Sequence, residues 1–185
     1  MLAINTTPAA PRPAARGRGF TLVEILGVVM ILGIISAILI PQISSRDDQK
    51  AASAARVVMA DLLYAQNRAI TVQKAHYVQF DAAAGTYQVL EGMSPAAVIK
   101  NPVNGGTYQV KFGAGSPNGL TQMSLQSATF DGQATLAFDP MGVPYSYNAS
   151  TGALSALNAG SVVIKSGAYQ VTVSVAPFSG ELRVQ

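Results

Sequence analysis

One segment limits the possible folds of this chain more than any other. Residues 20–40 read FTLVEILGVVMILGIISAILI, and Glu24 is the single charged residue among them. As a helix this segment would measure about 31 Å, at about 1.5 Å per residue, close to the thickness of the hydrocarbon core of a bilayer. Its length therefore predicts a membrane span over residues 20–40, with a buried core helix as the alternative.

The segment before this run has a different composition. Residues 1–19 are rich in Ala, Pro and Arg and show no periodic apolar pattern, so we interpret them as an unstructured leader. Arg12, Arg16 and Arg18 lie there. Because Lys and Arg concentrate on the cytoplasmic side of membrane helices, the N-terminus is predicted to be cytoplasmic and the bulk of the chain to lie outside the cytoplasm.

The same three arginines account for the basic net charge. Removing them from the 12 Lys and Arg leaves nine, equal to the 9 Asp and Glu. The charge balance therefore gives no indication of a nucleic-acid-binding surface. The apolar run is also too long for an ordinary secretory signal, and no Ala-x-Ala cleavage site follows it.

Glu24 is the unusual residue of the apolar run. An ionised side chain inside a membrane helix costs several kcal/mol unless it finds a positive partner or reaches the headgroups. Cleavage between Gly19 and Phe20 would create an ammonium group on Phe20, about one helical turn from Glu24. That group could neutralise Glu24 within one chain or in an axially staggered neighbour; the alternative is that Glu24 extends to the headgroups.

Residues 18–24, RGFTLVE, resemble the processing site of type IV prepilins and type II secretion pseudopilins. The resemblance implies that a membrane prepilin peptidase cleaves after Gly19 and methylates the new amine of Phe20, and that Glu24 acts in assembly. Pro41 lies where members of this family commonly carry a helix proline. The resemblance also implies that the helix breaks or partly unwinds between Gly33 and Pro41 on filament assembly.

A second helix is predicted by periodicity within residues 41–75, from Asp47 to about Lys74. Its apolar residues recur at spacings of four and three, which places them on one helical face: Val58, Leu62, Ala65, Ala69 and Val72. If it were nearly continuous from Phe20, the helix would have about 55 residues and a length of roughly 80 Å. Its amphipathic half would need a globular domain to cover its apolar face.

Residues 76–185 have the pattern of an antiparallel β domain. Aromatic and β-branched runs around a glycine-containing turn predict a hairpin of residues 76–80 and 86–90. Further strands are predicted at residues 107–112, 120–125, 134–138, 143–147, 161–165, 169–175 and 182–184, and a loop at 91–106. The sequence therefore predicts an α+β fold, with a long N-terminal helix packed on a C-terminal antiparallel β domain.

The C-terminal part carries a second resemblance. Residues 138–144, FDPMGVP, and later residues 171–175 and 179–184 are similar to the globular domain of H-type minor pseudopilins and FimT-like minor pilins. In those proteins a strand with a Phe-x-Pro-x-Gly turn precedes a final hairpin. This resemblance implies a type IV pilin-like fold.

No catalytic constellation is apparent. His76 is the one histidine and is interpreted as a structural residue, while Asp131 and Asp139 lack the spacing of a calcium loop and are assigned turn or capping roles. We expect no enzyme activity, no cofactor and no metal site. Lys165 and Arg183 are the basic residues that could contact DNA, but phosphate binding needs a cluster, so DNA is not an expected partner.

The resemblances together imply a minor pseudopilin or minor pilin. The expected protein spans the bacterial inner membrane once, has a periplasmic C-terminal domain, and is assembled into a periplasmic or extracellular filament of a type II secretion system. Its expected partners are the prepilin peptidase, other pilin or pseudopilin subunits, and secreted cargo. The alternative is a minor type IV pilin of pilus assembly or DNA uptake; a membrane-anchored enzyme ranks last.

Overall fold

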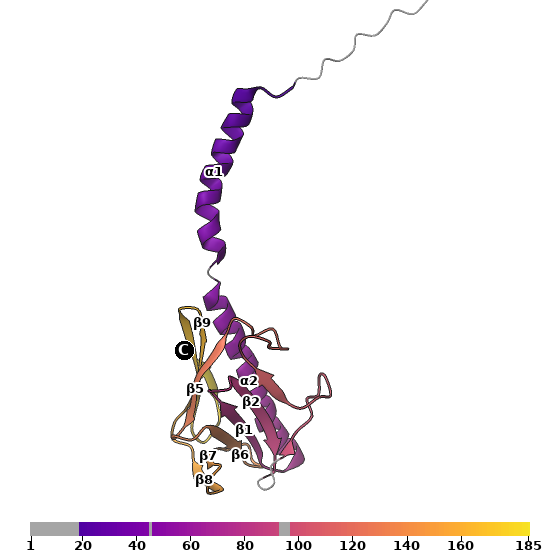
Figure 1. Cartoon of the computed structure of the whole chain (residues 1–185). Coiled ribbons are helices and arrows are strands. Elements are labelled where there is room, and N and C mark those ends of the chain that lie inside the picture. Colours follow the sequence, from indigo (N-terminus) through magenta and orange to yellow (C-terminus); the bar gives the residue numbers. More distant parts are fainter. Residues whose placement is uncertain (1–18, 45, 93–96) are drawn as a thin grey trace, which may run out of the picture. The chain divides into compact units, whose positions relative to one another are not determined.

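The computed structural model describes residues 19–44, 46–92 and 97–185, and gives only the backbone of residues 38–44. The chain divides into two compact units, Met1–Ser44 and Ser45–Gln185. Figure 1 shows a helix in the first unit and a helix with β-sheets in the second. Apart from Gly19, the predicted leader lies outside the described residues.

The first unit contains helix α1 (Leu22–Ser44), which runs through Gly33 and the backbone of Pro41 without interruption. Helix α2 (Asp47–Val72) begins three residues after α1 ends, and Arg46 at its N-cap has non-helical angles, φ −97° and ψ 30°. The continuous helix considered from the sequence is therefore two helices. The acidic pair Asp47 and Asp48 opens α2, where the helix dipole favours negative charge.

Helix α2 buries the face that its periodicity predicts. Val58, Leu62, Ala65 and Ala69 are at most 1% exposed, whereas Val72, at the end of the helix, is half-buried. Three further alanines near the start of α2 are fully buried: Ala51, Ala54 and Ala55. Small side chains along one face let the strands approach the helix closely.

The first sheet has seven strands in the order β3-β2-β1-β6-β7-β8, and β4 pairs with β2 beside β3. All pairs are antiparallel. The strands are β1 (His76–Asp81), β2 (Thr86–Glu91), β3 (Ala97–Val98), β4 (Gln109–Lys111), β6 (Thr135–Phe138), β7 (Pro144–Asn148) and β8 (Ala153–Ala156). The predicted hairpin of β1 and β2 is confirmed, and β6 lies on the other side of β1.

The second sheet has four antiparallel strands in the order β11-β10-β9-β5. They are β5 (Ser124–Phe130), β9 (Gly160–Ser166), β10 (Tyr169–Val175) and β11 (Leu182–Val184). Helix α2 contacts β1 and β6 of the first sheet and β9 and β10 of the second. One core therefore joins both sheets and α2, and its largest fully buried side chains include Tyr87, Phe130, Phe138, Leu62, Leu136 and Ile164.

Three predictions for the β domain need correction. The segment predicted as a loop at 91–106 contains β3, and the strand predicted at 120–125 begins only at Ser124 and continues to Phe130. Strand β8 was missed, because its four residues are all exposed and show no apolar–polar alternation. The predicted α+β fold, with a helix packed on antiparallel sheets, is confirmed.

Candidate functional site

The start of α1 is a capped helix end. Thr21 precedes the helix, and its hydroxyl accepts the backbone N–H of Glu24 at 3.3 Å, while its carbonyl accepts the N–H of Ile25 at 3.2 Å. Threonine at the N-cap with glutamate three residues later is the capping-box sequence. Glu24 therefore lies in the first helical turn, where a carboxylate is favoured by the helix dipole. The sequence carried this signal in Thr-Leu-Val-Glu, although the capping role was not predicted.

Gly19 and Phe20 lie just before this cap, outside the helix, and both are exposed. The bond between them is therefore in irregular, accessible backbone, as a peptidase substrate requires. Phe20 is 77% exposed and Leu22 81%, and large apolar side chains remain exposed along α1 as far as Ile35. Such a continuous apolar surface marks a segment that contacts lipid or other proteins.

The two glycine-containing turns quoted from the C-terminal sequence meet at α2. The side-chain amide of Gln66 donates to the carbonyl of Gly142 at 2.8 Å and to the carbonyl of Ser179 at 3.0 Å. Gln73 donates to the carbonyl of Pro140 at 3.3 Å. Gln66 therefore ties the Phe-Asp-Pro-Met-Gly turn and the final turn to one point of the helix.

Both turns need glycine at this meeting point. Gly142 has φ +83° and Gly180 has φ +69°, a region that side chains rarely adopt. A Cβ on Gly142 would lie 2.8 Å from Cδ1 of Ile70, and one on Gly180 would lie 2.6 Å from Nε2 of Gln66. The sequence showed the turns, but nothing in it indicated that Gln66 would join them.

The aspartates assigned to turns hold a turn and a loop in the structure. One carboxylate oxygen of Asp139 accepts the backbone N–H groups of Met141 at 2.8 Å and Val143 at 2.9 Å. Asp131 accepts the N–H groups of Asn158 at 2.8 Å and Ala159 at 3.0 Å. The predicted turn role is therefore confirmed for Asp139, whereas Asp131, itself in a turn, holds the loop between β8 and β9.

His76 is fully buried, and its Nδ1 donates to the carbonyl of Lys74 at 2.9 Å. Its Nε2 lies 3.7 Å from Glu91, which also accepts a hydrogen bond from Lys74 at 3.0 Å. The hydrogen bond from Lys74 is the main reason that the pKa of Glu91 is below its ordinary value. The structural role predicted for His76 agrees with this position.

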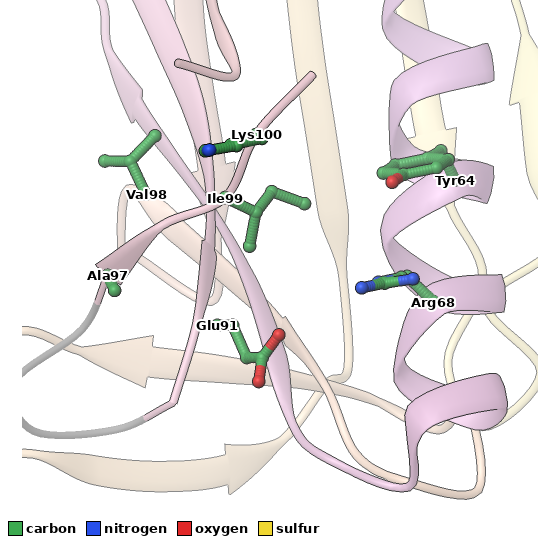
Figure 2. Close-up of a pocket in the computed structure, with 7 residues that line it drawn as sticks. All are labelled: Tyr64, Arg68, Glu91, Ala97, Val98, Ile99 and Lys100. Atoms are coloured by element: carbon green, nitrogen blue, oxygen red, sulfur yellow. The ribbon is translucent and has the colours of Figure 1, made fainter. Parts of the chain in front are cut away.

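Next to Glu91 is an open pocket of about 460 Å³. In Figure 2, Tyr64 and Arg68 extend from α2 on one side, and Glu91 and residues 97–100 lie on the other. The described lining mixes positive, negative and apolar side chains and does not bring a nucleophile and a base together.

Comparison with known proteins bears on both ends of the chain. Residues 15–40 match the prokaryotic N-terminal methylation motif. The type II secretion system core protein G of Pseudomonas aeruginosa is 53% identical over 38 residues, which cover 20% of this chain and 27% of that protein. The chain thus matches only about a quarter of the length of that curated relative.

The fold has a solved counterpart. The structure of the minor pseudopilin EpsH from the type 2 secretion system of Vibrio cholerae superposes with a TM-score of 0.52. The superposition covers 74% of this chain and 96% of EpsH, at 15% sequence identity. The chain thus carries an N-terminal methylation motif and has a fold similar to that of EpsH.

The predicted resemblance to type IV pilin-like proteins and pseudopilins is thereby confirmed. Gly19, Phe20 and Glu24 all fall inside the matched motif. Cleavage after Gly19, methylation of Phe20 and the assembly role of Glu24 stay predictions.

The membrane span predicted for residues 20–40 also stays a prediction. Among the residues whose side chains the structure describes, no helix is both long enough and apolar enough to cross a membrane. The side chains of residues 38–40, at the end of the predicted span, lie outside the described part. Gly33 and Pro41 lie inside α1, so the predicted break there is not a feature of this conformation.

The two basic residues considered for DNA do not form a cluster. Arg183 of β11 pairs with Glu181 through two hydrogen bonds, at 3.0 and 3.1 Å. Arg183 aligns through Ser174 with Ser161 of β9, whereas Lys165 lies four residues further along that strand. At about 3.3 Å per residue, Lys165 is thus roughly 13 Å further along the sheet and two strands away.

Proposed function

We propose that this protein is a minor pseudopilin, a structural subunit of the short filament of a type II secretion system. Its prepilin peptidase would cleave between Gly19 and Phe20 and methylate the new amine. The apolar helix would anchor the subunit in the inner membrane and, after assembly, pack among the helices of other pilin-like subunits. The globular unit would lie in the periplasm and contact other subunits or secreted cargo.

The observation that carries this proposal is the arrangement of residues 19–24 at the start of α1. An exposed Gly19–Phe20 bond precedes the capped end of an apolar helix. Glu24 lies in the first turn of that helix, four residues after Phe20. Removal of the leader would leave an ammonium group close to a carboxylate. Each would otherwise be an unpaired charge at the edge of an apolar environment.

Type II secretion is favoured over a type IV pilus by similarity to two secretion-system proteins, core protein G at the N-terminus and EpsH in the fold. DNA uptake is less favoured, because Arg183 is already paired with Glu181 and Lys165 lies apart from it. A structural role is proposed rather than a catalytic one.

Substitution of Glu24 tests the proposed role in assembly. The glutamine variant, Glu24→Gln, keeps a side chain that suits a capping box but removes the charge. We expect Glu24→Gln and Glu24→Val to be inserted and cleaved like the unaltered chain. Their recovery in filaments that are crosslinked inside the cell and then purified is expected to fall at least tenfold, because a tenfold change needs only about 1.4 kcal/mol of lost pairing energy.

The matched control is Ile25→Val, which changes the neighbouring residue without altering charge. Its recovery in filaments should equal that of the unaltered chain. Normal recovery of Glu24→Gln together with loss of Glu24→Val would show that helix capping, and not charge pairing, is what assembly requires.

A further inference from the structure

Strand β8 forms an open edge of the first sheet. It pairs with β7 on one side and is the last strand of the order on the other. Its sequence is Ala-Leu-Ser-Ala, and all four residues are exposed. An edge strand presents unpaired backbone N–H and C=O groups, which can pair with a strand of another chain.

The other described edges carry features that discourage such pairing. Strands β3 and β4 have two and three residues and are followed or ended by Lys100 and Lys111. Strand β11 has three residues and contains the charged Arg183. Strand β5 is longer, but its register with β9 shifts between Leu125 and Ser127, and such a bulge twists an edge away.

By contrast, β8 has four residues, no charge, no proline and no register shift against β7. Charges, proline and bulges are the usual devices that protect an edge from pairing. Among the edges that the structure describes, β8 is therefore the one whose chemistry permits a further strand.

The backbone groups that face outward on β8 can be assigned from its contact with β7. The carbonyl of Ser155 accepts the hydroxyl of Ser146 of β7 at 3.3 Å, so it is directed toward that strand. Backbone groups of successive residues in an antiparallel strand point to opposite sides. Those of Leu154 and Ala156 therefore face away from β7. No strand pairs with them, and the carbonyl of Ala156 accepts only the side-chain amide of Asn158, at 3.5 Å, a weak contact that an added strand would replace.

The side chains of the same two residues end an apolar row on one face of the sheet. Leu154 is the register partner of Tyr147, and Ala156 is the partner of Tyr145. The ring of Tyr147 in turn lies 4.9 Å, between centroids, from the ring of Tyr77 on β1. Because direct cross-strand partners share a face, an added strand with apolar residues opposite Leu154 and Ala156 would extend this row.

We propose that β8 pairs antiparallel with β8 of a second copy of this chain, in the register centred on Ser155. Two-fold symmetry then places Leu154 of each copy opposite Ala156 of the other, and Ser155 opposite Ser155. The outward backbone groups of Leu154 and Ala156 become two hydrogen-bonded pairs. The large and small apolar side chains match across the interface, and no like charges meet. This contact is independent of the axial pairing proposed for Glu24.

The register gives a direct test. The chain has no cysteine, so Ser155→Cys would provide its one thiol. In the proposed pairing the two Ser155 residues form a pair without backbone hydrogen bonds, whose Cα atoms lie about 4.5 Å apart, within the range that a disulfide spans. The full-length Ser155→Cys chain in detergent micelles, under mild oxidation, should form a disulfide dimer at least tenfold faster than Ser150→Cys.

Ser150 is a suitable control because it is also exposed and lies in the loop of the same hairpin. In the proposed register the two copies of Ala153 would be four residue steps apart, roughly 14 Å, and Ser150 lies beyond Ala153 in the loop, so its two copies would be further apart than a disulfide spans. Adding Ala156→Pro to Ser155→Cys removes an outward N–H and should lower the rate to that of Ser150→Cys. Leu154→Lys added to Ser155→Cys, which places a charge on the edge without changing the backbone, should do the same.

Equal rates for Ser155→Cys and Ser150→Cys would overturn the proposal, as would a rate that neither added substitution lowers. Faster dimerisation of Leu154→Cys than of Ser155→Cys would also contradict it, because it would show a register centred on Leu154. In the absence of a cysteine dimer, the edge would remain open to a strand of a different protein, and a second copy would be the wrong occupant.

Discussion

Gly142→Ala is expected to lower the free energy of unfolding of the globular unit by about 2–3 kcal/mol. An alanine at φ +83° costs about 1–2 kcal/mol of backbone strain. Its Cβ would also lie 2.8 Å from Cδ1 of Ile70. Because that side chain is 42% exposed and can move, the contact should add only about 1 kcal/mol, the low end of the cost of overpacking. The displaced turn would in addition strain the hydrogen bond from Gln66 to the carbonyl of Gly142.

Gly119→Ala separates these two causes. Gly119 has φ +76°, but a Cβ there would meet nothing within 4 Å. It should therefore cost only the strain of about 1–2 kcal/mol. Urea unfolding of the full-length chain in detergent, followed by circular dichroism, measures both variants; equal losses would show that contact with α2 does not require glycine at position 142.

Asp61→Leu is expected to cost about 2–4 kcal/mol at neutral pH. The carboxylate of Asp61 on α2 accepts the hydroxyl of Tyr87 at 2.5 Å and that of Tyr108 at 2.9 Å. Both tyrosines are at most 5% exposed, so leucine would leave two buried hydroxyls without a partner. Each unsatisfied buried group costs about 1–3 kcal/mol, partly offset because the carboxylate no longer has to be desolvated.

The same carboxylate makes stability depend on pH. Burial raises the pKa of Asp61 above its ordinary value, and the hydrogen bonds from Tyr87 and Tyr108 only partly oppose this. A carboxyl whose pKa is higher in the folded state contributes stability that is full below its unfolded pKa and is lost as the pH rises through the folded pKa. As the pH rises from the acid range toward neutral, ionisation of Asp61 therefore lowers the free energy of unfolding of the globular unit.

Asp61→Asn tests the pH effect while keeping one of the two acceptor oxygens; its NH2 group can donate to the oxygen of the other tyrosine hydroxyl. Asp61→Asn should lose less free energy of unfolding than Asp61→Leu. Its free energy of unfolding should also depend less on pH than that of the unaltered chain between about pH 4, the ordinary aspartate pKa, and about pH 7. Urea titrations at several pH values measure this. An unchanged slope in Asp61→Asn would mean that other carboxyl groups produce the dependence.

The features that depend on a single continuous segment were predicted from the sequence. The apolar face of α2 and the hairpin of β1 and β2 follow from side-chain periods of 3.6 and 2, which any single segment reveals. The N-terminal motif is likewise a continuous string, so Gly19, Phe20 and Glu24 could be identified without the fold. The start of the second helix at Asp47 was predicted and is confirmed, whereas the non-helical backbone at Arg46, which depends on local angles and not on hydrophobicity, was not predicted.

The contacts that were missed join residues far apart in the chain. Gln66 lies 76 residues from Gly142 and 113 from Ser179, and Asp61 lies 26 residues from Tyr87. A polar residue on a helix gives no signal of which distant backbone it will meet. Strand β8 was missed for a different reason, since a fully exposed strand of Ala, Leu and Ser lacks the alternation that a half-buried strand must have.

The first residue of the mature protein tests the central proposal most directly. The full-length chain would be produced with a prepilin peptidase, and the intact mass of the membrane fraction measured. We expect a chain that begins at Phe20 and carries one methyl group, and an uncut chain when an inactive peptidase is used. A mature chain that begins at Met1, or one cut after residue 40, would contradict the proposed processing and the pairing of Glu24 with the new amine.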